Sequence, residues 1–116
     1  MMSDEPKFKP GDPGDSSALN KQTAAVLKRA AELIRQGWTQ GYYADGDKFC
    51  AMGAIHKGYV DCSASPFVIQ CCFDALHKQI NDTSIGRWND QKERTQDEVI
   101  AALEAAASLA EWKGEY

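Results

Sequence analysis

The spacing of apolar residues along the chain predicts three long helices. In the first, residues suited to a buried face recur at intervals of three and four, after Ser16 or Ser17 as a cap. These residues are Leu19, Thr23, Val26, Leu27, Ala30, Leu33 and Ile34. The pattern is that of an amphipathic helix of about five turns. Gly37 is placed to end this helix in a left-handed conformation.

The other two long helices are predicted in the second half of the chain. Ser65 caps the second, and Pro66 lies in its first turn, where the missing N–H costs nothing. A wide apolar face makes this helix, at residues 66–80, the expected centre of the fold. The face consists of Phe67, Val68, Cys71, Cys72, Ala75, Leu76 and Ile80. Thr95 and Glu98 form a capping box that opens the last helix. Its predicted core face consists of Val99, Ile100, Leu103, Ala106, Ala107, Ala110 and Trp112.

Residues 37–55 interrupt the helical pattern with aromatic residues, glycines and one cysteine. The pair Asp45-Gly46 lies between residues that favour strands, which predicts a tight hairpin of two very short strands. A short helix is expected at residues 51–58, with Gly58 as its stop. Cys50 would then lie at a junction between strand and helix.

The remaining segments are predicted to lack regular structure. Residues 81–94 are polar except for Ile85 and Trp88, which favours turns anchored to the core by the tryptophan. Residues 1–15 contain three of the four prolines and are predicted to be a flexible tail, or else a peptide that docks on a partner through Phe8. The expected fold is therefore mostly α, a compact four-helix single domain at residues 16–116 with a short β-hairpin between the first two helices.

Composition and charge narrow the class of protein. At 116 residues and 43% hydrophobic residues, the chain can bury a core without metals or disulfides. It has no apolar run near the roughly 20 residues that a membrane span needs, and no secretion signal, so a cytoplasmic location with reduced cysteines is expected. A net charge of -4 with scattered basic residues argues against nucleic-acid binding. Neither a membrane nor a nucleic acid is thus an expected partner.

Three motifs follow one another along the chain. They are Gly37-Trp38-Thr39-Gln40-Gly41, then Cys50-Ala51-Met52-Gly53-Ala54-Ile55, then Trp88-Asn89-Asp90 followed by Thr95 and Glu98-Val99-Ile100-Ala101-Ala102-Leu103. In this order they resemble a domain-of-unknown-function family of small proteins from actinobacteria and their phages. The resemblance covers roughly residues 18–110 and excludes the proline-rich tail and the cysteines at 62, 71 and 72. It implies a small helical protein of bacterial or phage origin. It implies no activity, and no catalytic or binding residue is carried over.

A thiol nucleophile is the sharpest catalytic hypothesis. A helix N-terminus stabilises a thiolate, so Cys50 is the candidate nucleophile, with His56 or His77 as base and Asn89 or Asp90 orienting the base. The alternative is a packed, inert Cys50, because cysteine is among the most commonly buried residues. The spacings of cysteines and histidines match no structural zinc site, and Asp45-Gly46-Asp47 lacks the remaining ligands of a calcium loop. No metal or other cofactor is expected.

Two aromatic segments form the candidate binding site. Aromatic rings beside amides and an acid can line a pocket or contact patch. The residues are Trp38, Gln40, Tyr42, Tyr43, Trp88, Asn89 and Asp90. In the alternative interpretation, the two indoles plug the ends of the helical core, while Asn89 and Asp90 bond the loop backbone.

The expected function is non-enzymatic, since the sequence has no phosphate loop, metal cluster or pair of catalytic carboxylates. We expect a small intracellular protein that binds another protein, including the case of a phage factor that acts on its host. The alternative is a thiol-dependent hydrolase or transferase that uses Cys50. The oligomeric state and the partner's identity stay open.

Overall fold

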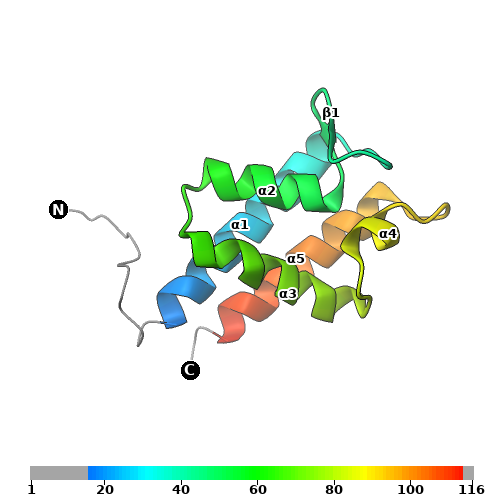
Figure 1. Ribbon diagram of the computed structural model, residues 1–116. Coiled ribbons are helices and arrows are strands. Elements are labelled where there is room, and N and C mark those ends of the chain that lie inside the picture. Colours follow the sequence, from blue (N-terminus) through cyan, green and yellow to red (C-terminus); the bar gives the residue numbers. More distant parts are fainter. Residues whose placement is uncertain (1–15, 114–116) are drawn as a thin grey trace.

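The computed structural model describes residues 16–113, and side chains within residues 18–111. This part of the chain folds into two layers of helices (Figure 1). The elements are α1 (Ser16–Gln36), β1 (Ala44–Asp45), β2 (Lys48–Phe49), α2 (Ala51–Asp61), α3 (Pro66–Ile80), α4 (Ile85–Asn89) and α5 (Gln96–Lys113). Helices α2 and α3 lie in front of α1 and α5, with α4 and the hairpin at one end. The mostly helical fold and its hairpin are confirmed, but the described residues form five helices rather than four. The tail predicted at residues 1–15 lies outside the described part.

The additional helix is α4, in a segment that was predicted to form turns only. Ser84 caps it, since its Oγ accepts a hydrogen bond from the backbone N–H of Arg87 at 3.1 Å. Ile85 and Trp88, three residues apart, face the core and are 2% and 8% exposed. A capped single turn that buries two apolar side chains is more stable than an irregular loop, and this is why the prediction of turns was wrong here.

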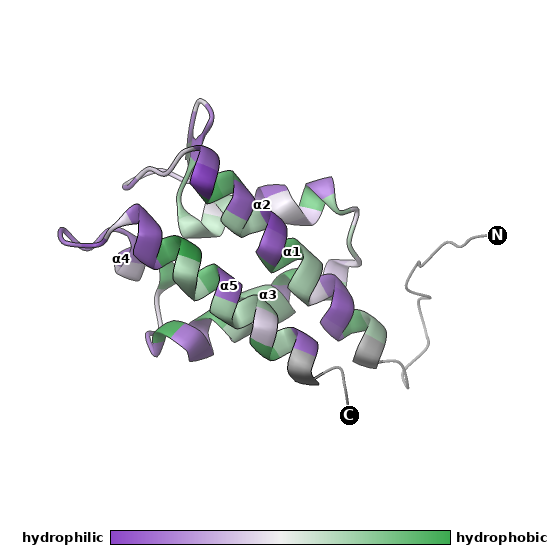
Figure 2. Cartoon of the chain, turned by 180° about the vertical axis from the view of Figure 1, so that it is seen from behind, coloured by the Kyte–Doolittle hydropathy of each residue, from purple (hydrophilic) through white to green (hydrophobic). Residues whose placement is uncertain are grey.

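The centre of the fold is α1, and the expectation that α3 would occupy this place was wrong. Helix α1 contacts α2, α3 and α5. Its buried residues are Thr23, Ala24, Val26, Leu27, Ala30, Ala31, Leu33 and Ile34. Helix α3 buries only Val68, Cys72 and Leu76, and Phe67 is 64% exposed. The physical reason is that α1 carries small alanines between large side chains, which lets three helices approach it. Figure 2 shows hydrophobic and hydrophilic bands alternating along α1.

Helices α1 and α5 pack as an antiparallel pair. Lys28 pairs with Glu111 at 2.6 Å, and Arg35 pairs with Glu104, so residues advance along one helix as they recede along the other. These ion pairs are exposed and contribute little stability. The predicted capping box starts α5: Glu98 N–H donates to Thr95 Oγ1 at 3.2 Å, and Thr95 N–H donates to Glu98 Oε1 at 3.0 Å. The hydrogen bond from the Thr95 backbone lowers the pKa of the Glu98 carboxyl.

Two predicted glycine stops are corrected by the structure. Gly58 does not end α2, which continues to Asp61 and stops where Ser63 adopts a φ of 50°. Gly58 is instead buried where α2 crosses α1, and a Cβ there would lie 2.9 Å from the carbonyl oxygen of Val26. Gly37 does follow α1, but without the left-handed conformation. Its carbonyl accepts from the N–H of Phe49 at 3.1 Å, so the chain passes directly from α1 into contact with the hairpin.

Candidate functional site

The predicted hairpin is present and is joined by the segment that follows α1. Ala44 pairs with Phe49 and Asp45 with Lys48 in antiparallel register, and the turn between them uses Gly46 at a φ of 63°. Trp38 forms a parallel bridge to Phe49, reinforced by a hydrogen bond of 3.1 Å from Thr39 N–H to the Phe49 carbonyl. The loop that leaves α1 therefore lies against β2.

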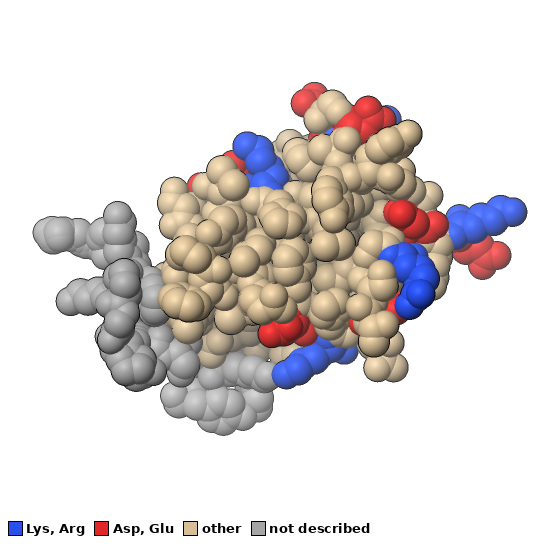
Figure 3. Space-filling view, viewed as in Figure 1, with Lys and Arg blue, Asp and Glu red and all other residues tan. Residues whose placement is uncertain are grey.

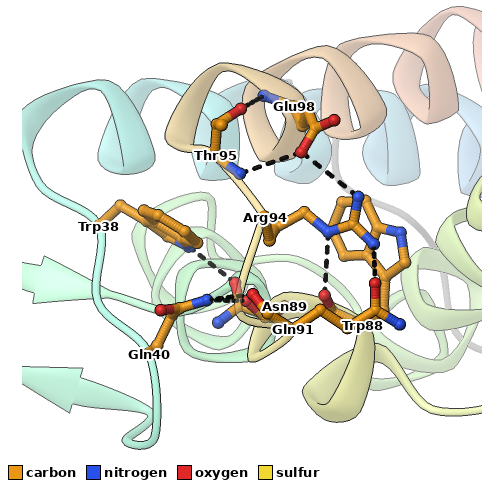
Figure 4. Close-up of polar contacts among 8 residues, drawn as sticks. All are labelled: Trp38, Gln40, Trp88, Asn89, Gln91, Arg94, Thr95 and Glu98. Carbon is orange, nitrogen blue, oxygen red and sulfur yellow. Dashed lines mark hydrogen bonds and ion pairs between the residues drawn. The ribbon is translucent and has the colours of Figure 1, made fainter.

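Asn89 connects this loop to two helices (Figure 4). Asn89 is 0% exposed, and its side-chain amide accepts two hydrogen bonds and donates two. Oδ1 accepts from the Trp38 indole N–H at 2.8 Å and from the Ala51 backbone N–H at 3.0 Å. Nδ2 donates to the Thr39 carbonyl at 3.2 Å and to Asp90 Oδ1 at 3.0 Å. One buried amide thus fixes the loop after α1, the start of α2 and the end of α4.

Gln40 and Asp90 add further hydrogen bonds between two loops, the one that follows α1 (residues 37–43) and the one that follows α4 (residues 90–95). Gln40 Nε2 donates to the carbonyls of Asn89 and Gln91, each at 2.9 Å. In the opposite direction, Asp90 Oδ1 accepts from the Gly41 N–H at 2.9 Å. The backbone on both sides of the tyrosines is therefore held, because the Tyr43 carbonyl also accepts from Cys50 N–H at 3.1 Å.

Arg94 supports the α4 end of this arrangement. Its guanidinium lies 4.1 Å from the centre of the Trp88 ring, and its Nε donates to the Trp88 carbonyl at 3.0 Å. Further contacts reach Gln91 Oε1 at 2.7 Å and Glu98 Oε1 at 3.4 Å (Figure 4). The Trp88 ring therefore packs between the core and Arg94, which in turn contacts the Glu98 carboxylate.

An open pocket of about 250 Å³ lies between the two loops and the start of α2. We call it the tyrosine pocket, and its lining residues are Gly41, Tyr42, Tyr43, Cys50, Gly86 and Asp90. Of the predicted binding residues, Tyr42, Tyr43 and Asp90 line it. The other four, Trp38, Gln40, Trp88 and Asn89, form the contacts that hold the loops together. Gly41 and Gly86 also line the pocket but were not predicted as binding residues, because a residue without a side chain carries no chemical signal of its own.

The tyrosines are the most exposed aromatic residues near the pocket. Tyr42 is 67% exposed and Tyr43 is 63% exposed. The Tyr43 ring lies 6.4 Å from the His56 ring on α2, which in turn lies 5.5 Å from Phe73 on α3 in an edge-on arrangement. An aromatic row thus leads from the loop across α2 to α3. Figure 3 shows that most of the face formed by α2 and α3 carries no charged side chain.

Cys50 lies at the wall of the pocket but is largely covered. It is 4% exposed and is the N-cap residue of α2, where its Sγ accepts from the Gly53 N–H at 3.4 Å. Burial raises the pKa of the Cys50 thiol, and the negative charge of Asp90 adds to this effect. Among the described contacts, no hydrogen bond joins Cys50 to an imidazole: His56 contacts the rings of Tyr43 and Phe73, and His77 lies in the last turn of α3. At neutral pH the sulfur is a protonated helix cap.

A model of a family of unknown function, DUF6197, matches residues 19–109. The chain belongs to this family. Neither a curated protein nor a solved structure matches it. The expected membership in a family of unknown function is confirmed over residues 19–109, close to the expected range of 18–110, while the origin in actinobacteria or their phages stays a prediction.

The described part of this DUF6197 chain holds neither a metal-binding cluster nor a membrane-spanning helix. No three His, Cys, Asp or Glu side chains between residues 18 and 111 are grouped so that they could hold a metal ion. All four cysteines are free, with Cys62 exposed and Cys71 half-buried. No helix among the described residues has the length and apolar character needed to cross a membrane.

Proposed function

We propose that this DUF6197 chain is a protein-binding module whose contact surface is centred on the tyrosine pocket. The observation that carries the proposal is the exposure of Tyr42 and Tyr43, 67% and 63%, on a loop whose backbone is fixed. A tyrosine ring offers a large apolar area with a polar tip, and such residues are enriched at the energetic centres of protein interfaces.

The fixed backbone of the tyrosine loop supports a role of the two exposed rings in binding a partner. Gly41 N–H is held by Asp90, and the Tyr43 carbonyl is held by Cys50 N–H, at 2.9 and 3.1 Å. A loop that is already ordered loses little conformational freedom when a partner binds, so more of the contact energy appears as affinity. The uncharged face of α2 and α3 extends the surface that a protein partner would cover (Figure 3).

The biological setting belongs to the proposal as well. We place the chain inside a bacterial cell, encoded by an actinobacterium or by one of its phages, with a host protein as the partner. The resemblance of the three motifs to such proteins supports this setting, so the lysate of an actinobacterial host is the place to look for the partner.

Site-specific photo-crosslinking tests the proposed surface. A photoreactive phenylalanine analogue replaces Tyr42 in one variant and Ser108, an exposed residue of α5 in the layer behind α2 and α3, in the matched control. The expected result is a discrete crosslinked protein from position 42 that position 108 does not yield. The captured partner is then purified, and Tyr42→Ala/Tyr43→Ala should weaken its affinity by at least about tenfold. Equal crosslinking from both positions, or an unchanged affinity, would contradict the proposal.

The alternative is a thiol-dependent hydrolase or transferase that uses Cys50. One observation favours it, namely that Cys50 lines the pocket. Burial opposes it, because a raised pKa keeps the thiol protonated. Under this alternative, Cys50→Ser would abolish an activity while leaving partner binding at position 42 unexplained.

A further inference from the structure

We propose that the tyrosine pocket receives an arginine side chain of the protein partner, with Asp90 as the counter-charge and Tyr42 and Tyr43 as the aromatic walls. This inference rests on the proposed function and specifies the chemistry of the partner. It follows from the bonding state of Asp90, from the walls of the pocket and from the surrounding charge.

The Asp90 carboxylate is oriented but has no cationic partner among the described residues. Its Oδ1 accepts two hydrogen bonds, from Gly41 N–H at 2.9 Å and from Asn89 Nδ2 at 3.0 Å. Its Oδ2 accepts none from the described residues, and within residues 18–111 Asp90 forms no ion pair. Because Asn89 is itself fully bonded and buried, the carboxylate is held in one direction before any ligand arrives.

The neighbouring arginines are engaged elsewhere. Arg87 on α4 contacts Asp82 at 3.7 Å, and Arg94 contacts Glu98 at 3.4 Å. Neither therefore neutralises Asp90 from within the chain. A carboxylate at a pocket wall, with one oxygen open and no cationic partner among the described residues, favours a cation supplied from outside.

The walls of the pocket select the kind of cation. Aromatic faces attract guanidinium groups, which are planar, weakly hydrated and able to stack, more readily than the strongly hydrated ammonium of lysine. The chain already uses the same pairing internally, where Arg94 lies 4.1 Å from the centre of the Trp88 ring. A volume of about 250 Å³ suits one long side chain rather than a larger cofactor.

The surrounding charge favours a basic partner. The net charge of the chain is -4, and the adjacent hairpin carries Asp45 and Asp47 beside Lys48, so together with Asp90 these residues have an excess of negative charge. Figure 3 shows acidic side chains over the hairpin end of the molecule, with basic side chains among them. An anionic ligand would be repelled there, whereas a basic segment would be attracted before contact.

The test uses N-acetyl-arginine-N-methylamide as the probe and isotope-labelled full chain in a heteronuclear NMR titration at low ionic strength. We expect saturable shifts of the backbone amides of Gly41, Tyr43 and Gly86. The citrulline analogue has nearly the same shape without the charge, and it should bind at least about tenfold more weakly. The lysine analogue should be weaker than the arginine probe.

Matched variants locate the probe. Asp90→Asn keeps the oxygen that accepts from Gly41 and Asn89 but removes the charge, so the fold should persist while the titration weakens at least about tenfold. Asp74→Asn, at an exposed carboxylate on α3, is the control and should titrate like the wild type. Tyr42→Ala should also weaken binding.

Several outcomes would overturn the inference. They are an absence of saturable shifts at the three pocket amides, equal binding of the citrulline analogue, and undiminished binding by the Asp90→Asn variant. If photo-crosslinking at position 42 still captures a partner when the arginine probe fails, the protein-binding function stands and only the arginine assignment is lost.

Discussion

The side-chain oxygen of Asn89 accepts a hydrogen bond from the backbone N–H of Ala51 at 3.0 Å, so a residue of α4 caps the first turn of α2. The first N–H groups of a helix have no partner within the helix. In α2, Asn89 satisfies the one at Ala51 and the Cys50 sulfur satisfies the one at Gly53. The cap therefore comes from a distant segment, and the same amide orients the pocket carboxylate of Asp90.

Replacing this amide should be costly. We expect Asn89→Ala to lower the free energy of unfolding by about 3 kcal/mol, because the Trp38 indole N–H, the Ala51 N–H and the Thr39 carbonyl would lose their partner in a buried place. Urea unfolding followed by circular dichroism measures the change. Asn20→Ala on α1 is the control and should change the stability by less than about 0.5 kcal/mol. A loss at Asn89 no larger than at Asn20 would refute the capping role.

The second prediction contrasts two glycines that lie close to each other in the fold. A Cβ at Gly53 would lie 1.9 Å from the Tyr43 carbonyl oxygen, whereas one at Gly86 would meet only Met52 Sδ at 3.9 Å. Gly53→Ala should therefore cost about 3 kcal/mol and displace the tyrosine loop. Gly86→Ala should be neutral or slightly stabilising, since alanine favours a helix. Thermal unfolding of the two variants compares them directly, and similar melting temperatures would contradict the close approach of loop and helix.

Local signals in the sequence were sufficient to predict the elements with strong periodicity or capping. The capping box of Thr95 and Glu98 and the hairpin at Asp45-Gly46 depend on residues a few positions apart, so they are predictable without the tertiary fold. The range of α1 follows from its apolar spacing for the same reason.

Features that depend on distant contacts could not be predicted from local patterns. Gly58 has the chemistry of a helix stop, but the proximity of Val26 across the helix crossing determines its role. The wide apolar face of α3 suggested a central helix, although what packs against a face cannot be inferred from its width. Part of the candidate site could be predicted, since the sequence singled out Tyr42 and Asp90. Which predicted residues line the pocket and which ones hold the loops beneath it depends on the hydrogen bonds of Asn89, which only the structure shows.

The third prediction concerns the reactivity of Cys50. Because burial raises the pKa of this thiol, the thiolate population at neutral pH is smaller than for an ordinary cysteine. Iodoacetamide labelling of the native chain, read by mass spectrometry, should modify exposed Cys62 first and Cys50 only slowly, at a rate that increases with pH. Labelling in urea is the control and should remove the difference. If native Cys50 reacts faster than in the unfolded chain, the thiol-dependent enzyme becomes the better hypothesis.

The fourth prediction is a loss of stability at alkaline pH caused by Cys72. This residue is fully buried in α3, its Sγ donates to the Thr23 carbonyl at 3.7 Å, and burial raises its pKa from 9.0 to about 12. Above pH 9 the unfolded chain releases the thiol proton while the folded chain retains it, so the unfolded state binds fewer protons. The free energy of unfolding must then fall with increasing pH, from 9.0 until the folded thiol also ionises near 12.

Urea unfolding at neutral pH and again midway between these two pKa values measures this contribution. Cys72→Ala should lower the stability at neutral pH through the cavity it leaves, yet show a smaller alkaline loss than the wild type. Val68→Ala removes a buried group of α3 that does not titrate, so it should be destabilised at neutral pH and keep the full alkaline loss. An equal alkaline loss in Cys72→Ala and the wild type would mean that other groups cause the pH dependence, because the removal of a thiol that titrates differently in the two states must change the slope.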